Sequence, residues 1–457
     1  MRTSLAVFTR DLRLQDNPAL AAAASSPAVV PAFVIDDDIV SRFSAHANRL
    51  AFLTESLADL DESLRLRGGS LVIRRGRWPA AVLALARESG ATAIHVADDY
   101  SGYAQRRLAS LTARAAADRI EVVRHPGITV AEPGNPAPAG GRAYQVFGPY
   151  YRRWQQLPVR PIAATPDRIR LPAGLNPGRL PALAELTTAC PAPARAPGGE
   201  RMANARLRAF EAGGLAGYAA GRDLLAAGHV SGLSPYFHLG CLSPRAVAAQ
   251  LAGQPGSEEF RRQLAWRDFF HQMLAAWPGS ARRDFRSRGD QWRDDRDALQ
   301  AWQAGCTGYP VVDAAMRQLA TEGYMPGRAR MIVASFLTKD LYLDWRSGAA
   351  HFMRALTDGD VACNQLNWQW VAGTGTDTNP NRIFNPIRQS ERFDADGEYL
   401  RKYLPELAGL PPDRIHDPPA DARRACGYPA PIVEHATATA EYRTATAGHR
   451  ARRAGSG

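Results

Sequence analysis

The sequence is poor in cysteine, and its cysteines follow no ligand or disulfide pattern. Five cysteines are scattered over 457 residues without a C-x-x-C pair, and no histidine cluster stands at ligand spacing. This argues against a zinc site and against a disulfide framework, and it is typical of a reducing cytosol. We therefore expect no bound metal and a cytoplasmic location.

Long hydrophobic runs are also missing. No run approaches the ~18 apolar residues that a membrane-spanning helix needs. The apolar run near Met1 is too short for a signal peptide. We expect no membrane partner.

Acidic charge and lysine are both scarce relative to arginine. The chain has 56 Lys and Arg against 45 Asp and Glu, a net charge of +11, and Lys339 and Lys402 are its only lysines. The planar guanidinium suits phosphate, so the excess favours a polyanionic partner such as nucleic acid. A GC-rich genome would explain the choice of arginine over lysine, but not the excess of base over acid.

The first 126 residues alternate between short apolar runs and helical periodicity. Strands are expected at 5–9, 29–35, 70–74, 93–97 and 120–123. Such alternation predicts a parallel, doubly wound sheet with a ligand crevice at the carboxyl ends of its strands. No G-x-G-x-x-G follows the first run, so a nicotinamide cofactor is not expected there.

The remaining chain divides into three further regions. Residues 127–200 are rich in proline and are expected to form a connector with one helix near 145–154. Residues 201–436 have helical periodicity and most of the tryptophans, which is typical of an all-α domain with a large core. Residues 437–457 are expected to be a frayed basic tail.

Two segments of the helical region carry recognisable patterns. Residues 231–240, SGLSPYFHLG, form a turn into a helix, where N–H groups and hydroxyls can hold a phosphate. Alone, this segment is better explained as a plain capped helix. Residues 302–319, WQAGCTGYPVVDAAMRQL, are more specific.

The second pattern closely resembles the photolyase–cryptochrome signature W-x-x-G-x-T-G-Y-P-x-V-D-A-A-M-R-x-L. Segments at 335–340, 344–346, 358–360, 367–370 and 382–386 match the same family in order. Residues 10–20, RDLRLQDNPAL, resemble its opening motif, although Val7 replaces the usual tryptophan. The resemblance covers nearly the whole chain and is strongest to class I cyclobutane pyrimidine dimer photolyases.

The resemblance implies an α/β doubly wound parallel-sheet domain followed by an all-α domain that binds FAD. It implies a monomer that repairs UV-damaged DNA, with a second, antenna chromophore in the sheet crevice, either methenyltetrahydrofolate or 8-hydroxy-5-deazaflavin. Arg330 and Asp358 would pair beside the isoalloxazine, although a purely structural ion pair is the alternative. Val230 replaces a threonine of the phosphate turn. The implied FAD contacts are Tyr218, Ser231, Leu233, Ser234, Arg330, Asp358, Asp360 and Asn364.

Asn364 is the most informative single residue of this resemblance. It falls where the family places a side chain against flavin N5, and a neutral amide there is compatible with a reduced, anionic flavin. Photolyases generally carry Asn at this position, plant cryptochromes Asp and animal cryptochromes often Cys. Asn364 therefore favours a repair enzyme.

The resemblance also implies an electron-transfer chain and a lesion pocket. Trp368, Trp345 and Trp292 match the family's chain from flavin to surface, although any one of them alone would more often be core. Stacking walls suit a flipped thymine pair. The implied lesion and DNA contacts are Arg222, Gln263, Trp266, Arg267, Arg328, Met331, Trp370, Arg382 and Gln389.

Two departures keep other readings open. Gln263 stands where cyclobutane enzymes carry a glutamate, and Gly327 replaces an asparagine near the flavin. A (6-4) enzyme would need histidines at Gly327 and Met331, so that lesion is disfavoured. The rival is a cryptochrome-like photoreceptor without repair, which Gln263, Gly327 and the tail support and Asn364, Met331 and both pocket tryptophans oppose. A basic DNA-binding protein without a cofactor is a third reading.

Overall fold

A sheet of five parallel strands forms the centre of the N-terminal half. The computed structural model describes residues 2–226 and 229–454. The strands lie in the order β3-β2-β1-β4-β5. Their bounds are β1 (Thr3–Phe8), β2 (Ala28–Asp36), β3 (Val72–Gly76), β4 (Ala91–Ala97) and β5 (Glu121–His125). Each lies within two residues of its expected ends, so the predicted doubly wound parallel sheet is confirmed.

Helices cover both faces of this sheet. Alternate strand residues supply the two layers: Val7 faces α4 (Trp78–Glu88) and α5 (Gly102–Ala117), while Phe8 faces α1 (Pro18–Ala23) and α3 (Ala47–Arg65). A strand buried on both faces reads as a continuous apolar run, as the first strand does. The short α2 (Asp37–Phe43) follows β2 directly.

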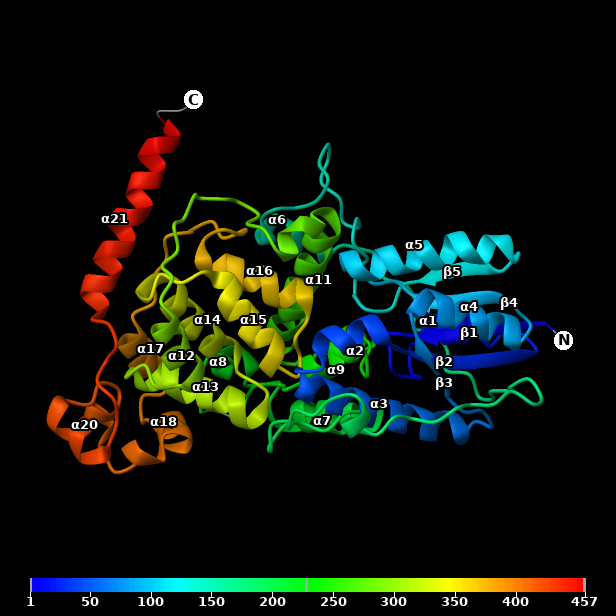
Figure 1. Cartoon of the computed structure of the whole chain (residues 1–457), viewed down its shortest axis with the longest axis horizontal. Coiled ribbons are helices and arrows are strands. Elements are labelled where there is room, and N and C mark those ends of the chain that lie inside the picture. Colours follow the sequence, from blue (N-terminus) through cyan, green and yellow to red (C-terminus); the bar gives the residue numbers. More distant parts are fainter. Residues whose placement is uncertain (1, 227–228, 455–457) are drawn as a thin grey trace.

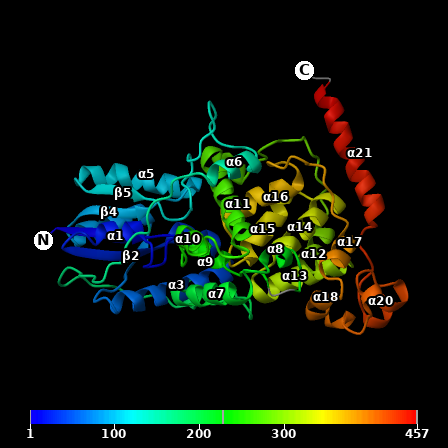
Figure 2. The ribbon, with the colours of Figure 1, turned by 180° about the vertical axis from the view of Figure 1, so that it is seen from behind.

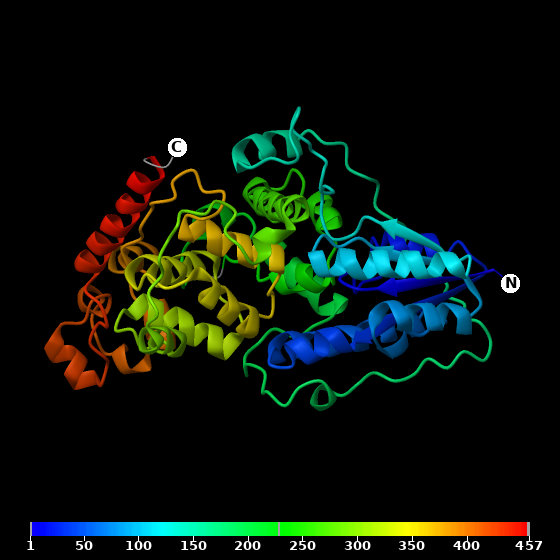
Figure 3. The same cartoon turned by 45° about the horizontal axis from the view of Figure 1, so that its top comes forward.

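A long connector links the two halves. Its regular structure is limited to α6 (Phe147–Trp154) and η1 (Leu183–Glu185) within the described residues 127–199. Figure 3 shows the connector passing along the outside of the α/β half before it enters the helical half. Proline removes backbone donors and restricts φ, which explains the scarcity of regular elements.

The second half is helical, as expected, and packs against the carboxyl ends of the strands (Figure 1). None of the described helices is long and apolar enough to cross a membrane.

The elements of the helical half are α7 (Glu200–Gly213), α8 (Tyr218–Gly221), α9 (Ser234–Leu239), α10 (Pro244–Gln250), α11 (Ser257–Ala276), η2 (Pro278–Ala281), α12 (Arg296–Ala304), α13 (Pro310–Glu322), α14 (Gly327–Ser335), the π-helical η3 (Phe336–Asp340), α15 (Trp345–Ala355), α16 (Val361–Ala372), α17 (Pro386–Phe393), α18 (Glu398–Tyr403), η4 (Pro405–Leu407), α19 (Pro412–Ile415) and α20 (Ala420–Cys426).

Residues 437–454 of the segment expected to be a frayed tail instead belong to a helix, α21 (His435–Ala454), at the outer edge of the helical half (Figure 2), and residues 455–457 of that segment lie outside the described part of the chain. Glu434 caps it by accepting hydrogen bonds from the N–H groups of Ala436 and Thr437. Tyr442 is buried, and Lys339 Nζ donates to its hydroxyl at 2.6 Å. An alanine-rich sequence with a cap and one buried anchor favours a helix over a frayed end.

Candidate functional site

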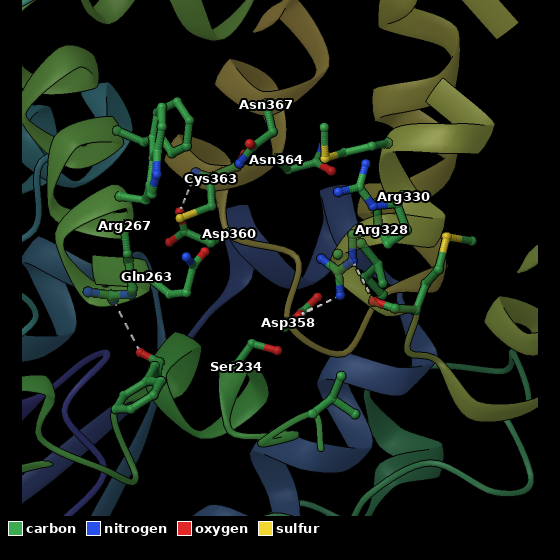
Figure 4. A pocket seen from close by; sticks show the side chains of 18 of the residues that line it. Ser234, Gln263, Arg267, Arg328, Arg330, Asp358, Asp360, Cys363, Asn364 and Asn367 are labelled. Carbon is green, nitrogen blue, oxygen red and sulfur yellow. Dashed lines mark hydrogen bonds and ion pairs between the residues drawn. The ribbon is translucent and has the colours of Figure 1, made fainter. Parts of the chain in front are cut away.

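A cavity of about 530 Å³ lies among α8, α9, α11, α14 and α16 (Figure 4). This volume is within the range of ~300–1,000 Å³ usual for ligand sites. The cavity brings together residues that are up to about 150 positions apart in the sequence. The predicted site residues that line it are Tyr218, Arg222, Ser231, Ser234, Gln263, Trp266, Arg267, Arg328, Arg330, Met331, Asp358, Asp360, Asn364, Trp368 and Trp370.

The remaining predicted residues lie outside this lining. Leu233 is fully buried beneath the turn, where its N–H donates to Ser231 Oγ at 3.3 Å. Gln389 accepts a long hydrogen bond of 3.5 Å from Arg328. Arg382 contacts the lining residue Trp370, whereas Trp292 and Trp345 do not belong to the lining.

One wall of the cavity carries the pair of Arg330 and Asp358. Arg330 Nη2 donates to Asp358 Oδ2 at 2.7 Å, and Arg330 Nε donates to the carbonyl of Met325. Burial would lower the pKa of Arg330, but the charge of Asp358 raises it above its usual value. Asp358 Oδ1 is buried and has no hydrogen-bond partner among the described residues. A buried carboxylate oxygen of this kind calls for a donor from a bound molecule.

The neighbouring carboxylate, Asp360, is held by a residue from the other half of the protein. Its Oδ1 caps α16 by accepting from the N–H of Cys363 at 2.8 Å, and its Oδ2 accepts from Arg10. Burial alone would raise the pKa of Asp360, but the charge of Arg10 holds it well below its usual value. Arg10 follows β1 and also pairs with Asp99 at 3.3 Å.

Three potential metal ligands meet at the same carboxylate. His271, Asp360 and Cys363 place one ligand atom each within 4.8 Å of one another. The cation beside Asp360 Oδ2 is the guanidinium of Arg10, which occupies the charge-compensating position. Burial lowers the pKa of His271 to about 3, so this imidazole is neutral near pH 7.

Asn364 projects from α16 with a fixed amide orientation. Its Nδ2 donates to the carbonyl of Ala349 at 3.0 Å, and the side chain is almost fully buried. The carbonyl oxygen Oδ1 is therefore left on the cavity side. An inward amide oxygen and the partnerless Asp358 Oδ1 fit a ligand with N–H and O–H donors, as FAD has.

The two pocket tryptophans are each supported from behind. Phe147 of α6 stacks on Trp266 with ring centroids 3.7 Å apart and an interplanar angle of 7°. The guanidinium of Arg382 lies 5.1 Å from the ring centroid of Trp370. Both indoles line the cavity, so each offers it an apolar surface.

The predicted rim arginines differ in what they contact. Arg222 pairs with Glu259 at 3.1 Å, and Arg328 pairs with Asp223 at 2.8 Å. Arg267 instead uses two nitrogens on the main-chain carbonyls of Ile128 and Phe237. It therefore joins the connector to the helical half as well as lining the cavity.

Of the three predicted relay tryptophans, Trp345 begins α15 and Trp368 lies on α16, whereas Trp292 lies in the loop between η2 and α12. Trp368 packs against Gly348, where an added Cβ would stand 2.2 Å from the indole. Gly348 is one turn after Trp345, whose Nε1 donates to Asp284 at 2.9 Å. Trp292 contacts Tyr342, which precedes Trp345 by three residues, at a ring-centroid distance of 5.2 Å.

Sequence reasoning missed Arg10, His238 and His271 as members of this site. Arg10 belongs to the opening motif that carried the resemblance, so a signal for it existed. The two histidines had none, because their partner Asp360 is about 90 or more positions away in the chain.

The chain matches two families over most of its length. Residues 4–167 match "DNA photolyase", and residues 260–447 match "FAD binding domain of DNA photolyase". A deoxyribodipyrimidine photo-lyase of Streptomyces griseus is 46% identical over 450 residues, covering 97% of this chain and 98% of the relative.

Solved structures agree with these matches. A bacterial class III photolyase from Agrobacterium tumefaciens superposes with a TM-score of 0.91 at 34% identity, covering 98% of each chain. An archaeal photolyase from Sulfolobus tokodaii with two FAD molecules gives a TM-score of 0.87 at 29% identity, covering 98% of this chain and all of that one.

Proposed function

The chain belongs to the DNA photolyase family, and on that premise we propose that it repairs UV-damaged DNA by splitting cyclobutane pyrimidine dimers in light. One observation carries the proposal. The same cavity is lined by the polar groups suited to FAD, among them Asp358 and Asn364, and by the apolar faces of Trp266 and Trp370. A flavin and a flipped dimer held there would be neighbours.

Bound and reduced FAD would supply the electron that opens the cyclobutane ring, and the electron would return to it afterwards. The protein's part is to hold and orient. Asp358 and Asp360, each paired with an arginine, offer fixed acceptors, and Asn364 presents its amide oxygen. Groups that are already partnered need no reorganisation when the ligand binds, which favours tight binding. Tyr218, Ser231 and Ser234 line the same cavity, and the phosphates would lie against them.

The dimer would enter between Trp266 and Trp370 after leaving the duplex. Phe147 stacks on the Trp266 ring and keeps it in place at the cavity wall. Arg222, Arg328 and Arg382 lie at or beside the cavity and would contact the phosphates on either side of the lesion. Phosphate contacts of this kind make binding sensitive to salt.

Trp368, Trp345 and Trp292 would carry an electron from the surface to the cavity when the flavin is oxidised. Each follows the previous one through a packed intermediate, Gly348 or Tyr342. Nε1 of Trp345 donates to Asp284, and a carboxylate beside an indole favours its oxidised, cationic form.

We further propose that the N-terminal domain holds a second, antenna chromophore, a folate or a deazaflavin. The support is the family and the crevice expected between β1 and β4, where the strand order reverses. Reconstitution of the purified protein with each chromophore, followed by energy transfer measured in the FAD emission, tests this point.

The experiment that tests repair uses the reduced, FAD-loaded protein and DNA with one defined thymine cyclobutane dimer. Blue light should restore the thymine absorbance with multiple turnovers, and a dark sample should show no change. Loss of the dimer in light would show that Gln263 and Gly327 are compatible with repair.

A yellow protein that photoreduces but restores no thymine would overturn the repair proposal. That result would favour the photoreceptor alternative. A colourless protein that cannot be reconstituted with FAD would exclude both.

A further inference from the structure

Glu259 stands just outside the cavity and touches two residues that line it. It lies one helical turn before Gln263 on α11. Its Oε1 accepts a hydrogen bond from Gln263 Nε2 at 3.2 Å and lies 3.1 Å from Arg222 Nη1. Gln263 and Arg222 line the cavity from different elements, and Glu259 does not. One carboxylate oxygen therefore links two lining side chains.

This contact decides which end of the Gln263 amide faces the cavity. An amide has a donor end and an acceptor end, whereas a carboxylate only accepts. Glu259 therefore holds the Nε2 end toward itself and leaves Oε1 on the cavity side. Figure 4 places Gln263 beside Arg267, across the pocket from Arg328 and Arg330. The Arg222 guanidinium strengthens the arrangement, because a charge-assisted contact holds the carboxylate in place.

The same carboxylate also limits what Arg222 can do. A phosphate that approaches Arg222 must compete with Glu259, so the pair weakens attraction to any DNA backbone. A pyrimidine that reaches Gln263 meets an acceptor already turned toward its imide N–H. Glu259 thus opposes binding that depends on phosphate alone and assists binding that depends on the base.

We propose that Glu259 is a positioning residue that sets the preference for dimer-containing over undamaged DNA, acting through Gln263 and Arg222. The inference rests on the proposed function and adds a specificity determinant to it. The alternative is a surface pair at i,i+4 spacing with no effect on recognition. The proposal predicts that loss of the Glu259 carboxylate changes the affinities for dimer-containing and undamaged DNA in opposite directions, whereas the alternative predicts no change in their ratio.

The test is binding in the dark of the FAD-loaded protein to a duplex with one thymine dimer and to the same duplex without it. Glu259→Gln should weaken binding to dimer DNA by about three- to tenfold, because an amide at this position can donate as well as accept and no longer fixes which end of the Gln263 amide faces the cavity. It should strengthen binding to undamaged DNA by about twofold, since it removes a negative charge beside Arg222. A loss of structure would weaken both.

Glu258→Gln is the matched control, because Glu258 is exposed on the same turn and makes the same change of charge. It should leave the ratio of the two affinities unchanged. Glu259→Asp keeps the charge but shortens the side chain, so it should weaken binding to dimer DNA without strengthening binding to undamaged DNA. Thermal melting of each variant checks that the fold is intact.

A double-substitution cycle completes the test. Gln263→Met keeps the length of the side chain and removes its hydrogen-bonding groups. On that background, Glu259→Gln should change both affinities in the same direction. Two results overturn the inference. In the first, Glu259→Gln leaves the ratio of the affinities for dimer-containing and undamaged DNA unchanged. In the second, Glu259→Gln lowers this ratio equally with and without Gln263→Met. A wild-type protein without any preference for the dimer overturns the proposed function itself.

Discussion

The two walls of the cavity are built in different ways. On the inner wall, Asp358, Asp360 and Asn364 are all less than a tenth exposed. On the rim, the side chains of Arg222 and Arg382 are 32% and 41% exposed. On the inner wall, Asp360 pairs with Arg10 from the other half of the protein, whereas at the rim the Gln263 amide donates to Glu259, one turn away on the same helix.

This difference separates the residues whose substitution costs much stability from those whose substitution costs little. A buried charge that loses its partner has no solvent to compensate it, so the inner wall constrains the chain strongly. Exposed pairs contribute little and can exchange partners with an incoming phosphate. The inner wall is therefore suited to a constant cofactor, and the rim to selecting among substrates.

The largest effect should follow from Arg10→Met, which leaves Asp360 buried without its cation. We expect a loss of about 3–5 kcal/mol in the free energy of unfolding, together with weaker retention of FAD. Urea unfolding and the ratio of flavin to protein absorbance measure the two. The control is Arg65→Met, since the Arg65 side chain is 65% exposed in its pair with Asp61 and the change should cost about 0–1 kcal/mol. An equal loss in the free energy of unfolding in both variants would mean that the buried pair contributes no more to stability than the exposed pair.

Trp266→Leu tests the wall that receives the base. Loss of the stacking face should weaken binding of dimer DNA by about 1–3 kcal/mol. FAD content should stay the same, because the inner wall is untouched. Binding of the two duplexes in the dark measures the effect, and Trp277→Leu, at the end of the same helix, should leave dimer binding unchanged. A parallel loss of FAD would show that the two walls are not independent.

Asn364→Asp places a second negative charge beside a reduced, anionic ligand. The fully reduced form of bound FAD should become about tenfold less favoured, equivalent to ~1.4 kcal/mol. Equilibration with dyes of known potential gives this ratio. Asn204→Asp replaces an amide that also donates to a main-chain carbonyl, but on α7 outside the cavity. If both variants shifted the potential alike, the position of Asn364 would not matter.

Gln263→Glu sharpens the description of the rim. It would set a second carboxylate one helical turn from Glu259, and the repulsion between like charges at this spacing costs about 0.2–0.5 kcal/mol. Dimer affinity should therefore fall by about twofold in the wild-type background. Combined with Glu259→Gln, the same change should cause no such fall. A gain in affinity in the wild-type background would mean that the two positions do not interact.

The smallest effect is expected from Arg382→Gln at the rim. It should reduce the slope of log affinity against log salt concentration by about one, with little effect on FAD or on stability. Titrations at several salt concentrations give this slope. Arg179→Gln, on the connector and paired with Glu185, should leave the slope unchanged.

The fold was largely predictable because its strands and helices depend on local periodicity. The apolar runs at 5–9 and 29–35 could be placed within two residues of β1 and β2. The tail could not, because the stability of α21 depends on the burial of Tyr442 against Lys339, about a hundred residues away. Composition alone gave no sign of that contact.

The candidate site, like the fold, could be predicted from the sequence only in part. Residues inside the matched motifs, such as Asp358 and Asn364, were placed by position, and the structure gathers them in one cavity. The support of Trp266 by Phe147 and the role of Arg10 needed tertiary structure, since neither spacing nor residue type indicates the partner. The roles assigned to these side chains remain predictions for the experiments above.

The pairing of Arg10 with Asp360, which are 350 positions apart, has a consequence for the order of events during synthesis. N-terminal domains generally fold first on the ribosome, so Arg10 is in place long before its partner emerges. Asp99, within the same half, can hold its charge during that interval. A cofactor site that includes Asp360 would therefore be completed only when most of the chain has left the ribosome, and FAD would join as a late event in the maturation of the protein.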